Sequence, residues 1–541
     1  MRKGIIYLFV IVVLAGILRF YNIANIPPSL TWDEVAWGYN AYSLGIDGKD
    51  EFGRFLPYDY LESFGDFKPP VYAYLGILPV KIWGITEFAT RFPSALFGTL
   101  TVLATFFLVL QIFYNSSEKE KIALFSSFIL AISPWHINLS RAAFEANVAQ
   151  FFIVLGVTFF LYAVNKKPWF LTLSAISFVI SLYTFNTARV FVPVLVAVFG
   201  MIYYKRLLNI KKQTILAIFT GVLLILPIVG FLLSPQASLR FKEVNIFSDP
   251  KIIEVSNQEV ANDGNAWWSK ILHNRRVGYV ESFVKHYFDN LSPRFLFISG
   301  DGNPKFSTQD IGQLYLWSLP FLIVGILFLF RRKEGYWYVI PVWFLLGIIP
   351  AATARETPHA LRIETVIPTL QIVEAYGLVL VLNFLKNKTK YYKFLRFTVF
   401  IFLFMNVSYY LYGYYVHYAR DYSGEWQYGY KESIEYVTSV EKNYDEIYIS
   451  TVLGRPYIYY LFHQHRDPSF LREKGVVSRD AFGFVTVGRI GKYNFVDDPS
   501  TMKSGGRDLY IDDINKIPSD VKVLKRIKLL NGEDTLLIYE R

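Results

Sequence analysis

The chain has 541 residues, of which 53% are hydrophobic, 18% aromatic and 18% charged, and its formal net charge is +11. Soluble domains carry about a quarter of their residues as charged side chains, so this composition indicates a membrane protein. There is no cysteine, which excludes disulfides, thiolate catalysis and cysteine-ligated zinc. A basic balance suits nucleic acid, anionic lipid or the cytoplasmic ends of membrane spans, and the location of the charges decides among them.

A membrane-spanning helix needs about 20 mostly apolar residues. We expect about eleven such spans, near residues 4–20, 90–113, 121–135, 143–164, 169–185, 189–204, 214–233, 311–330, 336–352, 363–384 and 395–415. The first follows a basic start, as a signal peptide does, but no small-residue cleavage site follows it, so we expect an uncleaved span. A cleaved signal is the alternative. Segment 70–86 starts at a proline pair and contains Lys81, so we expect it to lie at the interface or re-enter.

The distribution of charge along the chain gives a topology. With the N-terminus in the cytoplasm, the short inner loops carry Lys and Arg, as the positive-inside rule requires. These inner residues include Lys119, Lys121, Lys166, Lys167, Lys205, Arg206, Lys211, Lys212, Arg331, Arg332 and Lys333. The first outer loop is mostly acidic. The basic balance therefore belongs to cytoplasmic loops, and we expect no nucleic-acid partner.

Two domains follow from this reading. Residues 1–415 form a transmembrane domain with a first outer loop at 21–69 and a long outer loop at 234–310. Residues 416–541 form a small extracytoplasmic domain. In this tail a helical pattern near 425–442 precedes strand patterns at 446–450 and 535–539, which is typical of an α/β fold.

Two adjacent carboxylates, Asp33 and Glu34, stand among aromatic residues in the first outer loop. An apolar setting raises the basicity of a carboxylate, so either residue is a candidate general base. The alternative is local structure: Thr31 is a candidate N-cap, and acidic residues are favoured in the first turn of a helix.

Lys68 closes the same loop, immediately before Pro69 and Pro70, which stiffen the backbone. A cation held there suits a lipid phosphate. The alternative is an interfacial lysine whose ammonium reaches up to water.

Arginines on the outer side run against the positive-inside bias. They are Arg91, Arg141, Arg189, Arg355 and Arg362. A guanidinium binds phosphate with two parallel hydrogen bonds, whereas the alternative for each is pairing with Glu145, Glu356 or a lipid headgroup.

Histidine and tyrosine give weaker signals. His136 and His359 lack the spacing of metal ligands within one helix, so we expect no metal site. The chain has no Gly-rich phosphate loop, so nucleotide use is not indicated. Tyr39 and Tyr42 suit stacking on a sugar ring, or packing in an interfacial belt.

Taken in order, these motifs resemble the polyprenyl-phosphate-dependent glycosyltransferases of the GT-C fold, in particular bacterial protein O-mannosyltransferases and lipid A aminoarabinose transferases. The resemblance rests on Trp32-Asp33-Glu34, Lys68-Pro69-Pro70, Arg91-Phe92-Pro93-Ser94-Ala95, Ser133-Pro134-Trp135-His136 with Ser140-Arg141, and His359-Ala360-Leu361-Arg362. It covers residues 1–370.

The resemblance implies a polyprenyl-phosphate-linked sugar as donor, an active site under the first outer loop, and inversion at the anomeric carbon. Asp33 would be the general base, with Glu34 beside it. The donor phosphate would meet Lys68, Arg141 and Arg362. Contacts to the sugar or acceptor would come from Asp66, Tyr39, His136, Glu145 and His359. No cofactor and no divalent metal is expected.

One departure from the pattern concerns donor specificity. The aminoarabinose transferases carry a glutamate directly before the lysine, whereas this chain has Phe67 there and Asp66 one position earlier. Asp66 is therefore a candidate substitute for that glutamate, and the alternative is that the contact is absent. The sugar and the acceptor, whether protein, lipid or polysaccharide, stay open.

Three other functions compete with this one. A lipid-linked sugar transporter or flippase would show mid-membrane charges and often inverted repeats. A metal-dependent oligosaccharyltransferase would bind a divalent cation through outer carboxylates. A structural membrane protein with an exported sensory tail is the third. For the transferase, we expect a multi-pass protein of the plasma (inner) membrane.

Overall fold

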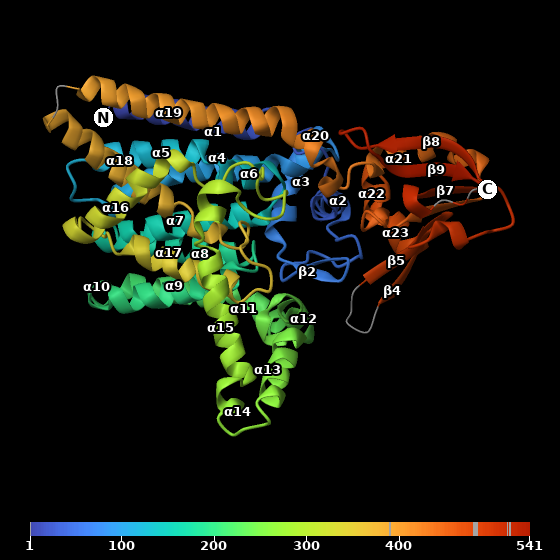
Figure 1. Ribbon diagram of the computed structural model, residues 1–541, viewed down its shortest axis with the longest axis horizontal. Helices are drawn as coiled ribbons and strands as arrows, with labels where there is room; N and C mark the ends of the chain where they lie inside the picture. Colours follow the sequence, from blue (N-terminus) through green and yellow to red (C-terminus); the bar gives the residue numbers. More distant parts are fainter. Residues whose placement is uncertain (1, 389–390, 480–484, 517, 519–520) are drawn as a thin grey trace. The chain divides into compact units, whose positions relative to one another are not determined.

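The computed structural model describes residues 2–388, 391–479, 485–516, 518 and 521–541 (Figure 1). The chain forms two compact units, each assembled from separate stretches of sequence. The first unit comprises Met1–Leu18, Phe97–Leu139 and Glu145–Tyr410. The second comprises Arg19–Leu96, Ser140–Phe144 and Leu411–Arg541.

Mostly apolar helices build the first unit. They are α1 (Arg2–Phe20), α4 (Glu87–Ile112), α5 (Lys119–Ile132), α6 (Pro134–Arg141), α7 (Glu145–Asn165), α8 (Phe170–Leu182), α9 (Ala188–Ile202), α10 (Tyr204–Asn209), α11 (Lys211–Leu232), α16 (Leu319–Arg332), α17 (Val339–Ala352), α18 (Thr369–Lys388) and α19 (Tyr392–Tyr412). α1, α4, α6 and α19 include residues of both units. Each of the eleven expected spans has a helix in the structure.

Six of the described helices are long and apolar enough to cross a bilayer, and a seventh span arises if α5 and α6, bent by 56° at Ser133, count as one. The prediction of a multi-pass helical membrane protein is confirmed. The expected number of eleven spans is not confirmed. α8 and α17, with 13 and 14 residues, reach only about 20 Å at 1.5 Å per residue, less than the hydrocarbon thickness of about 30 Å.

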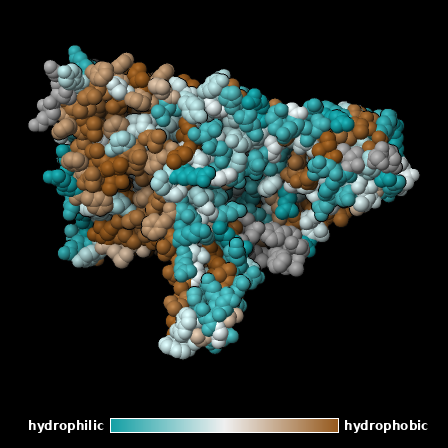
Figure 2. Space-filling model, in the orientation of Figure 1, coloured by the Kyte–Doolittle hydropathy of each residue, from teal (hydrophilic) through white to brown (hydrophobic). Residues whose placement is uncertain are grey.

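The hydropathy of the surface agrees with membrane embedding. Apolar residues gather over the helices of the first unit, and hydrophilic residues prevail over the C-terminal strands (Figure 2). α11 is largely exposed although it is strongly apolar, with only 17% of its most apolar window buried. Lipid is the solvent that such a helix needs.

The long connection between α11 and α16 is helical. It contains α12 (Pro235–Val244), α13 (Pro250–Asn262), α14 (Ser269–Leu272), α15 (Arg275–Asp289), a π-helical turn at Arg294–Ile298 and a 3-10 turn at Leu316–Ser318. Asp249 and Asn274 cap α13 and α15 by accepting hydrogen bonds from backbone N–H groups of the first turn. α13 to α15 project from the helices of this unit as a hairpin (Figure 1).

The second unit begins with the first outer loop. It contains α2 (Trp32–Asp47), the hairpin of β1 (Leu61–Ser63) and β2 (Asp66–Lys68), and α3 (Val71–Trp83). α3 has 13 residues, about 20 Å, so the segment expected not to span is indeed short.

The C-terminal part of this unit is a mixed sheet with helices. The elements are α20 (Ala419–Asp421), α21 (Tyr430–Val440), β3 (Glu446–Ser450), α22 (Pro456–His463), α23 (Pro468–Lys474), β4 (Gly475–Arg479), β5 (Val485–Ile490), β6 (Tyr493–Val496), β7 (Asp508–Asp513), β8 (Lys522–Lys528) and β9 (Asp534–Glu540). The strand order is β4-β5-β6-β3-β7-β9-β8, with β3 parallel to both neighbours. The predicted C-terminal α/β region is confirmed.

The first outer loop and the C-terminal helices share one core. α22 packs against α2, and Tyr459 donates a hydrogen bond from its hydroxyl to the carbonyl of Leu30 (2.9 Å). Residues from α2, α21, α22 and the sheet form a single buried apolar cluster. The predicted domain boundary after residue 415 stays a prediction.

Candidate active site

The start of α2 positions the first carboxylate. Thr31 accepts a hydrogen bond at its hydroxyl from the Glu34 backbone N–H (3.3 Å), and Glu34 accepts one at Oε2 from the Thr31 N–H (3.0 Å). This reciprocal capping box is the helix start that the sequence indicated. It directs the two neighbouring carboxylates differently: the Asp33 side chain is 52% exposed, whereas that of Glu34 is fully buried.

The hairpin of β1 and β2 delivers Lys68. Its two-residue turn, Phe64 and Gly65, has positive φ at both positions (62° and 79°), as a type I′ turn requires. Ser63 then faces Asp66 across the hairpin. Asp66 and Lys68 are two residues apart, so they lie on the same face of β2, while Phe67 packs its ring against Tyr60 (5.1 Å).

Lys68 and Asp33 form an ion pair. The lysine side chain is only 7% exposed, and its ammonium lies 5.2 Å from the ring centroids of both Trp37 and Phe64. Trp37 lies one helical turn after Asp33 on α2. A largely desolvated cation therefore meets a carboxylate that is open to solvent. Such a cation is a strong binding point for an anion, since its attraction is weakly screened.

Glu34 is held in a buried ion pair, and its predicted catalytic role stays a prediction. It is paired with Arg91 (Nε to Oε1, 2.8 Å), and it accepts a further hydrogen bond from the Ala143 backbone N–H (2.8 Å). Arg91 donates its other N–H groups to Glu34 again and to the carbonyls of Ile23, Pro27 and Ser29. Because both charges are buried and satisfied, Glu34 is better suited to holding the loop before α2 than to taking a proton.

Arg141 is bound in the same manner, and its expected role at a phosphate stays a prediction. It is fully buried. Its N–H groups donate to the carbonyls of Arg19, Tyr21 and Ile26 and to the hydroxyls of Tyr414 and Tyr415, at 2.8–3.3 Å. A guanidinium has five N–H donors, so a phosphate could bind only by displacing one of these partners. Arg91 and Arg141 together fix residues 19–31, the segment that leads into Asp33.

Glu51 is a buried carboxyl that the sequence did not single out. It is fully buried, and burial raises its pKa to about 8, although nearby Lys68 lowers it. Its backbone N–H donates to Asn40 Oδ1 (2.9 Å), and Asn40 donates to Ser63 (3.2 Å). Asn40 thus ties α2 to both the Glu51 segment and the β1–β2 hairpin. In the sequence Glu51 is one acid among many in the loop, and only its burial distinguishes it.

Tyr39 lies in the core, and its expected contact with a sugar stays a prediction. Its side chain is 0% exposed, and its hydroxyl donates to the carbonyl of Arg466 (3.1 Å). The expected role of Asp66 stays a prediction, although its place on the Lys68 face of β2 suits it.

The other expected site residues belong to the first unit. Trp135 donates its indole N–H to the carbonyl of Ala360 (3.1 Å), which joins the two motifs at residues 133–136 and 359–362. His136 is buried in α6, and Glu145 begins α7. Arg362 donates to Glu356 at both its carbonyl (3.0 Å) and its carboxylate (3.4 Å), which is the pairing foreseen as its alternative.

His359 is held beside Asp301, a second carboxyl that the sequence did not single out. Asp301 accepts a hydrogen bond from the Ala360 N–H (2.6 Å), and its Oδ2 lies 3.9 Å from His359 Nδ1. Burial raises the pKa of Asp301 to about 6, and burial together with Arg362 lowers that of His359 to about 3. His359 is therefore a neutral imidazole, packed on Phe306 (4.8 Å). The signal in the sequence is the turn Gly300-Asp301-Gly302-Asn303-Pro304.

Among the residues that the structure describes, no group of three or more His, Cys, Asp or Glu side chains is arranged to hold a metal ion. The expectation of metal-free chemistry stays a prediction.

Residues 9–244 match the family of dolichyl-phosphate-mannose-protein mannosyltransferases (PMT). This range contains Asp33, Lys68, Arg91, Arg141 and Glu145. An uncharacterized protein of Aquifex aeolicus (strain VF5) is 26% identical over 225 residues, 40% of each chain. The chain thus spans less than half the length of that curated relative.

Three solved structures share the fold. ArnT from Cupriavidus metallidurans in the apo state is 12% identical, with 98% of this chain and 97% of that chain covered and a TM-score of 0.54. The same protein bound to undecaprenyl phosphate is 13% identical, with 99% and 97% covered and a TM-score of 0.53. The Archaeoglobus fulgidus oligosaccharyltransferase tethered with an acceptor peptide is 14% identical, with 86% and 63% covered and a TM-score of 0.51. The predicted resemblance to GT-C enzymes is confirmed by the match of residues 9–244 to the PMT family model and by the fold shared with these structures.

Proposed function

We propose that this chain, which has a PMT-family domain and the GT-C fold, is an inverting glycosyltransferase that moves a sugar from a polyprenyl-phosphate donor to an acceptor hydroxyl. The single observation that carries the proposal is the ion pair between the exposed carboxylate of Asp33 and the buried ammonium of Lys68. Asp33 can take a proton from the incoming alcohol, while Lys68 stabilises the departing phosphate.

The reaction needs little more than these two groups. A bond forms between the acceptor oxygen and the anomeric carbon, while the bond from that carbon to the phosphate oxygen breaks. The acceptor proton goes to Asp33, and the electron pair of the broken bond leaves with the lipid phosphate beside Lys68. A phosphate is a good leaving group already, so the base and the cation supply the main assistance.

The ion pair also links donor binding to base strength. In the free protein the lysine charge stabilises the ionised form of Asp33. A phosphate that binds to Lys68 competes for this charge, and the carboxylate then becomes a stronger base. The base is therefore strengthened when the donor is in place.

Trp37 and Phe64 support this chemistry by keeping water away from the ammonium. Low local polarity strengthens the attraction between the cation and a phosphate. For the pair to reach a lipid-linked sugar, we place residues 21–69 and the C-terminal part on the outer face of the plasma membrane, with the N-terminus in the cytoplasm.

The test is transfer from a polyprenyl-phosphate sugar in proteoliposomes by the full chain. Asp33→Asn keeps the size of the side chain and should lower turnover by about 100- to 10,000-fold, as expected for the loss of a general base. Asp47→Asn, on the same helix and ion-paired with Arg472, is the matched control and should retain activity. Turnover by the Asp33 variant at the wild-type rate would eliminate this assignment.

An oligosaccharyltransferase reaction is the second candidate, because the Archaeoglobus fulgidus enzyme shares the fold. EDTA separates the two: transfer that is unchanged by EDTA supports Asp33 as base, whereas loss of activity restored by a divalent cation supports the alternative. A flippase would move the lipid-linked sugar across the bilayer without breaking the bond to phosphate, and the same vesicles would report it.

A further inference from the structure

The hairpin of α13 to α15 carries a large exposed apolar face. Trp267 is 76% exposed, Ile271 63%, Val280 62% and Phe288 63%. The exposed apolar residues of this face are Trp267, Trp268, Ile271, Val277, Val280, Val284 and Phe288, whereas Val255 and Leu272 line a pocket between α13 and α15. On α15 the positions 277, 280, 284 and 288 are spaced by three or four residues, so they share one side of the helix.

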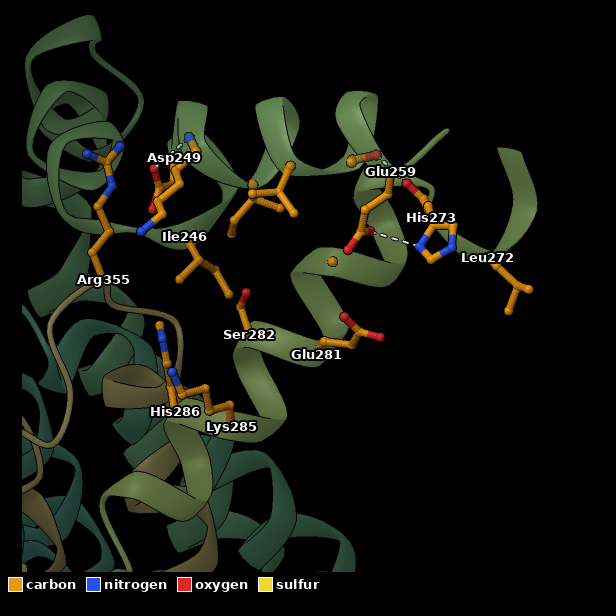
Figure 3. A pocket seen from close by; sticks show the side chains of 15 residues that line it. Ile246, Asp249, Glu259, Leu272, His273, Glu281, Ser282, Lys285, His286 and Arg355 are labelled. Atoms are coloured by element: carbon orange, nitrogen blue, oxygen red, sulfur yellow. Dashed lines mark hydrogen bonds and ion pairs between the residues drawn. The ribbon is translucent and has the colours of Figure 1, made fainter. Parts of the chain in front are cut away.

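A different side of the same hairpin is polar. There, α13 and α15 enclose a pocket of about 360 Å³ whose lining includes Lys251, Glu259, His273 and Lys285 (Figure 3). Glu259 pairs with His273 (2.8 Å). Ser282 lines the pocket as well. The hairpin is therefore amphipathic, with a charged side and an apolar side.

The C-terminal end of α15 is held against an apolar helix. α15 contacts α17, and Tyr287 donates from its hydroxyl to the carbonyl of Leu345 (3.0 Å). Leu345 lies two turns before the end of α17 at Ala352, about 10 Å along the axis. In Figure 1, α15 runs across the apolar helices of this unit rather than along them. Since spanning helices stand across the bilayer, the hairpin lies along its surface.

The apolar flank of the hairpin faces the bilayer in this orientation. Figure 2 shows hydrophobic residues along the flank of the hairpin that is turned toward the side where the spanning helices extend. The tip combines Trp267 and Trp268 with three cations, Lys270, Arg275 and Arg276, all exposed. Tryptophan and basic residues favour the interface between headgroups and acyl chains, where the cations meet lipid phosphate.

We propose that the hairpin Pro250–Asp289 is an interfacial membrane anchor, which lies in the lipid headgroup layer with Ile271 and Val280 toward the acyl chains and the pocket of Figure 3 toward water. Its partner is the lipid surface. A second copy or another protein could cover this face only from within the bilayer, so lipid is the partner that we propose. The inference depends on the membrane topology and not on glycosyl transfer.

The absence of cysteine in this chain makes the test direct. Single variants of the full chain, Ile271→Cys and Val280→Cys, are spin-labelled in lipid nanodiscs, with Ser282→Cys and Lys285→Cys as controls on the pocket side. Collision rates are measured with oxygen, which partitions into lipid, and with a water-soluble nickel chelate.

We expect the ratio of oxygen to nickel collisions to be severalfold higher at Ile271 and Val280 than at the two control positions. An equal or lower ratio at the apolar positions would place this face in water and overturn the proposal. Low collision rates with both reagents there would show that protein covers the face, which would overturn it as well. All four positions are wholly or partly exposed, so labelling leaves the core intact.

Discussion

The ion pair predicts that substitutions at its two members shift anion affinity in opposite directions. Asp33→Asn removes the charge that competes with a phosphate for Lys68. Because the Asp33 side chain is 52% exposed, the pair contributes about 1 kcal/mol or less, so the variant should bind polyprenyl phosphate up to about fivefold more tightly. Lys68→Met removes the cation itself. A hydrogen bond to a charged group contributes about 1.5–3 kcal/mol, which corresponds to about 10- to 100-fold weaker binding.

The assay is titration of the protein in nanodiscs with short-chain polyprenyl phosphate, followed by calorimetry. Lys81→Met, an exposed lysine of α3, is the matched control and should bind like the wild type. A fall in affinity in both Asp33→Asn and Lys68→Met would refute the reasoning, because the pair would then serve only to join α2 to the β1–β2 hairpin.

Three further predictions concern the groups around the site. Arg91→Lys keeps the charge but leaves Glu34 and three carbonyls short of donors, so the free energy of unfolding should fall by about 1–3 kcal/mol, measured by thermal unfolding against the partly exposed control Arg54→Lys. Burial raises the folded-state pKa of Glu51 from 4.5 to about 8. Between these pH values the folded protein binds more protons than the unfolded chain, so its stability should decline as the pH rises. Glu51→Gln should flatten this pH dependence of the melting temperature. Asp301→Ala removes the acceptor of the Ala360 N–H, so hydrogen exchange at that amide should accelerate by about tenfold or more. An unchanged rate would mean that this hydrogen bond does not protect the amide.

Local patterns account for much of what was predicted correctly. Thr31 followed three residues later by Glu34 is a capping box in the sequence and in the structure. The strand pattern at 446–450 became β3, and apolar length identified the spanning helices. Local patterns could not predict the burial and pairing of Glu34, Tyr39 and Arg141, because these depend on segments more than a hundred residues away, such as Ala143, Arg466 and Tyr414.

Hydrophobic runs, turn residues and loop charges by themselves determined that this chain is a helical membrane protein with a polar first loop and an α/β tail, since these features arise from solvation and from neighbours within a few residues. Only the tertiary structure decided which charges stay accessible. It paired Lys68 with Asp33 across 35 positions of sequence, and it directed the N–H groups of Arg91 and Arg141 into hydrogen bonds with loop carbonyls. The reason is physical: a guanidinium or carboxylate is available to a ligand only if folding leaves it without a full set of partners, and those partners come from distant parts of the chain.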